Sequence, residues 1–371
     1  MIDYARKIKL IIPDFDETLI NASFQAARID SMDLLTIRVE FENLNGQAFS
    51  DTDWLEFESL SDIINFCQNA LQQRKAELTP TSELIGKGKI QINMPQMAIQ
   101  ALSENWLFKE LGDMHWNLLC QGLKTKSFLL KDDLDNRLYA TFVRIKIEST
   151  IPLNEFIEND ELELNSNIER FGSGMYFSNI SLGSGNGNIR AELMTSFSIR
   201  DGIDNTKLTK SQPAASANSI SEYAQMPFFG DEYRLIKKGV TTELVLAGAR
   251  FSVVDDAVFT SRYELNPYYD LNGVGLLYFA AYPIISNFCE ARFFNHRENS
   301  DKRWEEEYHV IARDVLYFAN CNIEDNIVYV LNTYEFFGTN KVKMSSSLFR
   351  EKDMTLMARI FTIKVKRNEM A

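Results

Sequence analysis

The stretch RIDSMDLLT, residues 28–36, places Ser31 directly after Asp30 and two residues before Asp33. An amphipathic stretch follows at once, so we expect a helix to begin here. Acidic side chains suit the positive end of a helix dipole, and Asp30 or Ser31 is a good N-cap for the first unpaired backbone N–H groups. From these residues alone, Asp30 or Ser31 is a helix cap, and any further role of Ser31 depends on the surrounding sequence.

Other polar side chains fall on helices that the apolar spacing predicts. His115 lies one turn beyond Leu111, where a histidine is more often a hydrogen-bonded core residue than a general base. Ser286 continues the i, i+4, i+8 stripe of Tyr278 and Tyr282, which is more typical of packing than of chemistry. Polar residues near the start of the His115 helix can act as caps or as donors: Asn93, Gln96 and Ser103.

The composition argues against several kinds of site and partner. The net charge of −13 argues against nucleic-acid binding, which depends on clustered Lys and Arg. Four cysteines without C-x-x-C spacing, and three histidines of which none lies four residues from another, indicate neither a metal site nor a disulfide framework. The sequence has no long apolar run and no cleavable apolar leader. We therefore expect no membrane span and a cytoplasmic protein.

The first 75 residues have the pattern of an acidic helical bundle. They hold seven Lys or Arg and thirteen Asp or Glu. Apolar spacing predicts helices over residues 2–12, 31–45 and 59–71. The polar stretch QQRKAELTPTSELIGKGKI, which contains Pro80 and two glycines, predicts a linker. We expect a helical domain over residues 1–75 and a linker over residues 76–90.

Beyond the linker, a long helix followed by short strands occurs twice. The stretch LSENWLFKELGDMHWNLL has helical spacing, and strand-like runs separated by Gly and Asn turns follow it. A second apolar helix, from about Gly275 to Phe288, precedes a second set of strands. This order predicts an α+β double hotdog, in which curved antiparallel sheets each wrap around a central helix. We expect the first hotdog unit over residues 91–250 and the second over residues 251–371.

The acidic bundle resembles an acyl carrier protein. The stretch IDSMDLLTIRVEFENLNGQAFSDTDWLEFESLSDIINFC has the Asp-Ser pair, acidic amphipathic helix, Asp-rich turn and final helix of that family, with Met32 where leucine is common. The resemblance implies that Ser31 carries a covalent 4′-phosphopantetheine arm, added by a phosphopantetheinyl transferase. A helix N-terminus suits the negative charge of the phosphodiester, and an exposed position lets the arm swing.

Several separated blocks of the remaining chain resemble the leinamycin-type polyketide family of bifunctional acyltransferase/decarboxylases. These blocks are MPQMAIQALSENWLFKELGDMHW, RLYATFVRIKI, FGSGMYFS, NPYYDLNGVGLLYFAAYP and SLFREKDMTLMARIFTIK. The resemblance implies an enzyme that takes a malonyl or methylmalonyl group from malonyl-CoA or methylmalonyl-CoA and loads it on a carrier protein. The enzyme then decarboxylates the group to the acetyl or propionyl thioester, and the carrier is the fused domain or a separate protein.

The same resemblance implies roles for individual residues. The tyrosine of this family, as acyl acceptor or as donor to the thioester oxygen, corresponds by block position to Tyr139, with Tyr176 as the second choice. Asn272 and Gly273 precede the second buried helix, where hotdog enzymes place donors for the thioester oxygen, and Asp270 is a cap beside them. The candidate catalytic residues are Tyr139, Asn272, Gly273, His115 and Ser286. No metal is implied.

Two other functions stay open at this point. A hotdog thioesterase or dehydratase acting on carrier-bound acyl chains would use the same fold, because a fold alone does not settle a function. The low number of histidines counts modestly against dehydration. The third possibility is a non-catalytic module that carries or binds acyl chains.

Overall fold

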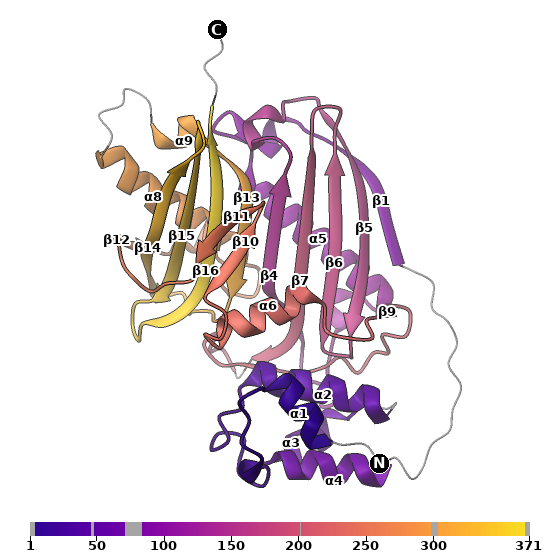
Figure 1. The fold of residues 1–371 in the computed structure, drawn as a ribbon. Coiled ribbons are helices and arrows are strands. Elements are labelled where there is room, and N and C mark those ends of the chain that lie inside the picture. Colours follow the sequence, from indigo (N-terminus) through magenta and orange to yellow (C-terminus); the bar gives the residue numbers. More distant parts are fainter. Residues whose placement is uncertain (1–3, 46–47, 71–83, 201, 298–302, 368–371) are drawn as a thin grey trace.

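The computed structural model describes residues 4–45, 48–70, 84–200, 202–297 and 303–367. Its first part contains four α-helices at one end of a large sheet (Figure 1): α1 (Tyr4–Ile11), α2 (Ser31–Asn45), α3 (Asp51–Glu56) and α4 (Leu60–Ala70). The prediction of a helix over residues 31–45 is confirmed, and α1 and α4 differ from their predicted bounds by one or two residues. We did not predict α3, which begins after the N-cap Ser50.

The chain beyond residue 83 builds one large, mainly antiparallel sheet. The first half of the sheet contains β1 (Leu84–Gln91), β4 (Tyr139–Ser149), β5 (Glu161–Phe171), β6 (Met175–Gly183) and β7 (Asn188–Arg200). The second half contains β12 (Phe259–Glu264), β13 (Tyr308–Tyr317), β14 (Asn326–Phe337), β15 (Lys341–Arg350) and β16 (Thr355–Lys366). The order along the sheet is β1-β5-β6-β7-β4-β13-β16-β15-β14-β12. The short strands β8 (Leu208–Lys210) and β9 (Ser221–Glu222) pair with β7 and β5.

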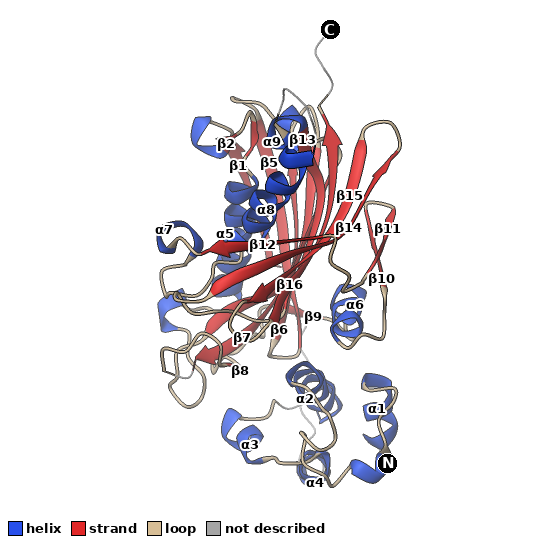
Figure 2. Ribbon diagram, turned by 90° about the vertical axis from the view of Figure 1, so that its left-hand side faces the viewer, coloured by secondary structure: helices blue, strands red, loops and turns tan. Residues whose placement is uncertain are grey.

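The two halves join through β4 and β13, which pair antiparallel from Arg144 opposite Leu316 to Glu148 opposite Ala312. Two long helices, α5 (Glu104–Gly122) and α8 (Ala281–Arg297), lie on one face of the sheet (Figure 2). Helix α5 contacts strands of the first half and α8 contacts strands of the second half. Each half therefore consists of a sheet around its own helix, which is the α+β double hotdog arrangement.

Smaller elements complete this part of the chain. The opposite face of the sheet carries α6 (Phe228–Lys237) and the hairpin of β10 (Glu243–Leu246) and β11 (Ala249–Ser252), as Figure 2 shows. The remaining short elements are β2 (Met97–Ala98), β3 (Ala101–Leu102), α7 (Pro267–Asp270) and α9 (Trp304–Glu307). In the described ranges, no helix is long and apolar enough to cross a membrane.

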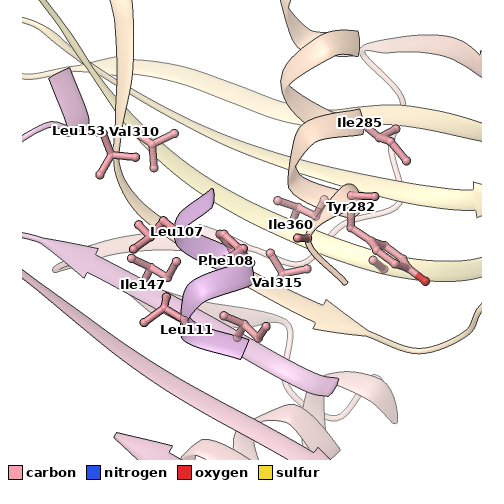
Figure 3. Packing of buried hydrophobic residues seen from close by; sticks show 14 of the residues in the cluster. Leu107, Phe108, Leu111, Ile147, Leu153, Tyr282, Ile285, Val310, Val315 and Ile360 are labelled. Carbon is pink, nitrogen blue, oxygen red and sulfur yellow. The ribbon is translucent and has the colours of Figure 1, made fainter. Parts of the chain in front are cut away.

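The main core lies between the two long helices and the sheet (Figure 3). Residues that α5, α8 and the strands contribute to it include Leu107, Phe108, Leu111, Ile147, Ile285, Val315 and Ile360. On α5 these positions recur at helical spacing, which places them on the face that meets the sheet. Ser103 is the N-cap of α5, as predicted, and its hydroxyl accepts a hydrogen bond from the backbone N–H of Trp106 at 3.3 Å.

Three predicted boundaries differ from the structure. The predicted linker is wrong over residues 84–90, which belong to β1. This edge strand is largely exposed and has the polar, glycine-containing composition of a linker. Residues 76–83 of the predicted linker lie outside the described residues. The predicted boundary between residues 250 and 251 falls inside β11. The second buried helix begins at Ala281 because Gly275, with φ +81°, belongs to a turn that Asn272 closes.

Helix α2 belongs to two cores at once. Ile37 and Phe41 are fully buried among the N-terminal helices. Met32, Leu35 and Val39 pack instead into the cluster formed by the sheet and α6. The β5–β6 turn comes very close to α2: a Cβ at Gly172 would lie 2.4 Å from a methyl carbon of Val39, and one at Gly174 would lie 2.6 Å from a methyl carbon of Leu35. The two glycines therefore let the backbone of the turn approach α2.

Candidate active site

A cavity of about 200 Å³ opens where α2 meets the joint between the two halves of the sheet. Its walls come from β4, β8, α6, the ends of β7 and β13, and the segment that leads into α8. The polar side chains that line it, apart from three tyrosines, are Ser31, Thr141, Ser198, Asn205, Thr206, Lys210, Lys237, Asn272 and Asn320. A bulge in β4 between Phe142 and Arg144 shapes this wall, and bulges commonly redirect side chains near functional sites.

Ser31 lies at the opening of this cavity. Asp30 is the residue that caps α2, because its Oδ1 accepts hydrogen bonds from the backbone N–H groups of Met32 and Asp33, both at 2.8 Å. Ser31 is the first helical residue and is exposed, while the next residue, Met32, is buried. The hydroxyl of Ser31 is therefore not needed as the cap and is accessible from the solvent and from the cavity.

Lys210 is the central charged group of the cavity. Its Nζ hydrogen-bonds to Ser196 Oγ and lies 3.3 Å from Thr141 Oγ1. Thr141 gives its own hydroxyl proton to the Ser196 carbonyl at 2.9 Å, so it accepts from Lys210, and Ser198 Oγ lies 3.1 Å from the same oxygen. Burial, and secondarily the charge of Lys237, lower the pKa of Lys210 to about 7. This lysine therefore changes charge near neutral pH.

Asn272 offers a hydrogen-bond donor to the cavity. Its side-chain oxygen accepts from the backbone N–H groups of Val274 and Leu276 at 3.1 and 3.0 Å. Since the oxygen is used in this turn, the amide nitrogen of Asn272 is the atom able to donate to a bound group. Beside it, the rings of Phe142 and Phe279 pack with their centroids 4.2 Å apart and form an apolar part of the wall.

Three tyrosine hydroxyls hold the walls of the cavity together. Tyr233 of α6 donates to the Tyr317 carbonyl at 2.6 Å, Tyr317 donates to the Phe279 carbonyl at 3.0 Å, and Tyr282 donates to the Ala319 carbonyl at 2.8 Å. Burial raises the pKa of all three phenols, so they stay neutral donors at physiological pH. The tyrosines therefore fix the shape of the cavity.

A second cavity, of about 330 Å³, lies on the α5 side of the same wall and is also lined by Asn272. Tyr139 and Gly273 line this second cavity. The ring of Tyr139 lies between two cations, with its centroid 5.3 Å from the guanidinium carbon of Arg137 and 5.6 Å from that of Arg200. The structure thus brings Asn272 and Ser31 to one cavity, and Asn272, Gly273 and Tyr139 to another.

The other candidates do not line either cavity. His115 is fully buried, its ring nitrogens lie 2.7 Å from Ser178 Oγ and 2.7 Å from Thr195 Oγ1, and burial lowers its pKa to about 3. Ser286 is buried with its hydroxyl 3.1 Å from that of Ser346. His115 and Ser286 therefore make internal contacts that are typical of structural residues.

Tyr176 and Asp270 also make internal hydrogen bonds. Tyr176 is fully buried and donates to the Ser173 carbonyl at 2.9 Å, and burial raises its pKa. Asp270 accepts hydrogen bonds from the Asn266 backbone N–H at 2.7 Å and from the Tyr263 hydroxyl at 3.0 Å. Asp270 thus stabilises α7 and, contrary to our expectation, does not cap the second long helix, because that helix begins only at Ala281.

Buried polar contacts hold the N-terminal helices against the sheet. The guanidinium of Arg38 lies 2.8 Å from Asp51 Oδ1, and both side chains are nearly inaccessible to solvent. The other oxygen of Asp51 accepts a hydrogen bond from the Ser211 hydroxyl, which comes from the sheet region, at 2.6 Å. At the start of α2, Asp30 lies 3.3 Å from Lys237, and Asp33 pairs with Lys238. These contacts keep Ser31 at the cavity.

Comparisons with known proteins support the fold assignment. No protein-family model matches the sequence, and no curated protein matches it either. A putative oleoyl thioesterase from Lactobacillus plantarum matches in structure with a TM-score of 0.52 and 10% identity, over 77% of this chain and 96% of that one. The fold is shared. A 12:0-ACP thioesterase from Umbellularia californica gives a TM-score of 0.47 with 11% identity, over 76% of this chain and 95% of that one.

The sequence did not single out Lys210. It stands in the polar segment LTKSQPAAS, where a lysine looks like an ordinary surface residue. Only the pairing of β8 with β7, Ser198 opposite Lys210, brings it beside the hydroxyl cluster. No local spacing signals this contact. Thr141 of β4 lies 69 residues from Lys210, and Ser196, 14 residues away, comes beside it only because β8 folds back on β7.

Proposed function

We propose that this chain is an enzyme that processes short acyl thioesters presented on its own Ser31. In this proposal Ser31 carries 4′-phosphopantetheine, and the hotdog region acts as an acyltransferase/decarboxylase for a malonyl or methylmalonyl group from coenzyme A. The observation that carries the proposal is the position of Ser31, exposed at the opening of the cavity that Lys210 and Asn272 line.

The opening of the cavity suits a phosphodiester. The dipole at the start of α2 favours negative charge next to Ser31, while the N–H groups of Met32 and Asp33 already donate to Asp30. Lys237 lines the same cavity and adds a positive charge there. An arm attached to Ser31 would have its phosphate at this positive end and its thioester deeper between the walls.

The interior supplies what decarboxylation of a malonyl-type thioester requires. When the bond to the carboxylate carbon breaks, CO2 leaves and the electron pair moves to the thioester oxygen as an enolate. A donor aimed at that oxygen stabilises the developing charge, and the amide nitrogen of Asn272 is such a donor. The apolar Phe142 and Phe279 exclude water from one side, which favours loss of the carboxylate.

The size of the cavity supports a short acyl group. Its volume of about 200 Å³ is below the roughly 300–1,000 Å³ of typical pockets for drug-sized ligands. A malonyl or methylmalonyl group on a slender arm matches this volume better than a long fatty acyl chain. A protein named as a putative oleoyl thioesterase shares the fold, so hydrolysis of the acyl arm is the second candidate reaction.

The test is intact-mass analysis of the full chain coexpressed with a phosphopantetheinyl transferase. We expect a pantetheine adduct that disappears in Ser31→Ala and persists in Ser216→Ala, a change at another exposed serine. Methylmalonyl-CoA should then add an acyl group that loses CO2.

Four results would decide against parts of this proposal. Without the adduct, the carrier assignment fails. A stable methylmalonyl adduct excludes decarboxylation, and release of the acyl group to leave bare pantetheine identifies a thioesterase. A Tyr139→Phe variant that decarboxylates at the full rate removes Tyr139 from the catalytic residues.

A further inference from the structure

The cavity below Ser31 has a positive lining in an acidic protein. The chain carries a net charge of −13, yet the residues that line this cavity include two lysines and no Asp or Glu. Lys237 is paired with Asp30, whose Oδ2 lies 3.3 Å away. Lys210 makes no ion pair within the described ranges; its described polar partners are the hydroxyls of Ser196 and Thr141.

This arrangement leaves Lys210 without a counter-ion. An ammonium group has three N–H donors, and the two hydroxyl partners account for two of them. Withdrawing a charge from water without an opposite charge is unfavourable, and the lowered pKa of Lys210 reflects this cost. A carboxylate in the cavity would supply both the missing acceptor and the missing charge.

We propose that Lys210 binds the free carboxylate of a dicarboxylic acyl thioester and so selects malonyl-type acyl groups over monocarboxylic ones. This inference rests on the proposed function, since it places the acyl group in the same cavity. Thr141 and Ser196 act as positioning residues because they hold the ammonium group at the wall. Lys210 contributes to substrate binding; since an ion-paired carboxylate resists leaving, it does not itself favour loss of CO2.

None of the other titratable groups that line the cavity with Lys210 supplies a negative charge. Lys237 faces it from α6, and its positive charge favours the neutral form of Lys210 in the empty cavity. Tyr233, Tyr282 and Tyr317 stay neutral because burial raises their pKa values. A bound carboxylate would restore the charged form of Lys210, so selectivity for it should fall as the pH rises well above 7.

The experiment compares two ligands that differ by one carboxylate, methylmalonyl-CoA and propionyl-CoA. Binding is measured by calorimetry at about pH 6 on the full chain with Ser31→Ala, so that no acyl group is transferred to the arm. We expect methylmalonyl-CoA to bind about ten- to a hundredfold more tightly, the range of a charge-assisted hydrogen bond. Lys210→Met should abolish the preference, and Lys210→Arg should keep much of it.

The control is Lys207→Met, which removes an exposed lysine from the same segment and should leave the preference unchanged. If Lys210→Met does not fold, the same titration at about pH 9 with Lys210 intact should show the loss of preference. Equal binding of the two thioesters, no binding of either, or a preference that survives both Lys210→Met and high pH would overturn the inference. None of these results bears on the pantetheine adduct, so failure of the proposed function is recognised separately.

Discussion

The close approach of Gly172 to α2 predicts a measurable coupling between the N-terminal helices and the sheet. Gly172→Ala would place a methyl group 2.4 Å from Val39 Cγ2 and 2.8 Å from Val39 Cβ, at a backbone φ of +61°. Gly202 has nearly the same φ, +59°, and its added Cβ would meet nothing within 4 Å. Gly202→Ala is therefore a matched control that has the backbone strain without the collision.

The expected magnitudes follow from these two effects. A left-handed conformation costs an alanine about 1–2 kcal/mol, which applies to both variants. Overpacking a filled core adds about 1–3 kcal/mol, and this applies only to Gly172→Ala. Because Val39 is fully buried, the collision can be relieved by separation of α2 from the β5–β6 turn. We therefore expect α2 to open about 5- to 150-fold more often in Gly172→Ala than in Gly202→Ala.

Hydrogen exchange followed by mass spectrometry measures this opening peptide by peptide. Amides of residues 31–45 should exchange faster in Gly172→Ala, with a smaller effect on α5 and on the central strands. The same exchange in the two variants would show that Gly172 does not control the docking of α2. Faster exchange spread evenly over the whole chain would also refute the reasoning, because it would indicate global destabilisation.

Two further predictions concern buried polar groups. Asp51→Ala leaves the buried guanidinium of Arg38 without one of its carboxylates, so we expect a loss of about 3–5 kcal/mol in unfolding free energy. The control Asp135→Ala breaks the exposed pair with Lys131 and should cost about 0–1 kcal/mol. Urea denaturation measures the unfolding free energy of both variants, and equal losses would contradict the prediction. Burial lowers the pKa of His115 from 6.5 to about 3, so the unfolded chain binds a proton at this residue more readily than the folded chain. The contribution of neutral His115 to the unfolding free energy is therefore complete above pH ~6.5, and it falls by up to ~1.4 kcal/mol per pH unit as the pH drops toward 3. His115→Gln should flatten this slope in urea midpoints measured from about pH 7 to about pH 5; an unchanged slope would refute it.

Local patterns in the sequence predicted the helices and the order of elements well. The bounds of α2 follow from the Asp30 cap and the apolar spacing after it, and Ser103 marked the start of α5 correctly. These signals are local, because capping and helical periodicity involve residues within a few positions of one another. The edge strand β1 was missed because its exposed side chains give no apolar alternation.

The site could be predicted only in part. We predicted Ser31 from the acyl-carrier pattern and Asn272 from the resemblance to hotdog enzymes, and both line one cavity. Lys210 was missed because its surroundings depend on the pairing of β8 with β7 and of β7 with the distant strand β4, which no local pattern shows. The sequence does contain one indication that α2 contacts the sheet: its apolar residues do not form a single stripe. They form two faces, Ile37 with Phe41 and Leu35 with Val39, which indicate a helix buried on two sides.

The position of α2 in two cores limits how the chain can be divided for engineering. Excising the N-terminal helices by cutting within residues 71–83 would expose Met32, Leu35 and Val39, which are buried against the sheet in the intact chain. A contiguous exposed apolar surface of this kind promotes self-association. Transplanting the helices to another protein would require polar residues at these three positions, whereas moving the whole chain as one cassette would keep Ser31 and the cavity together.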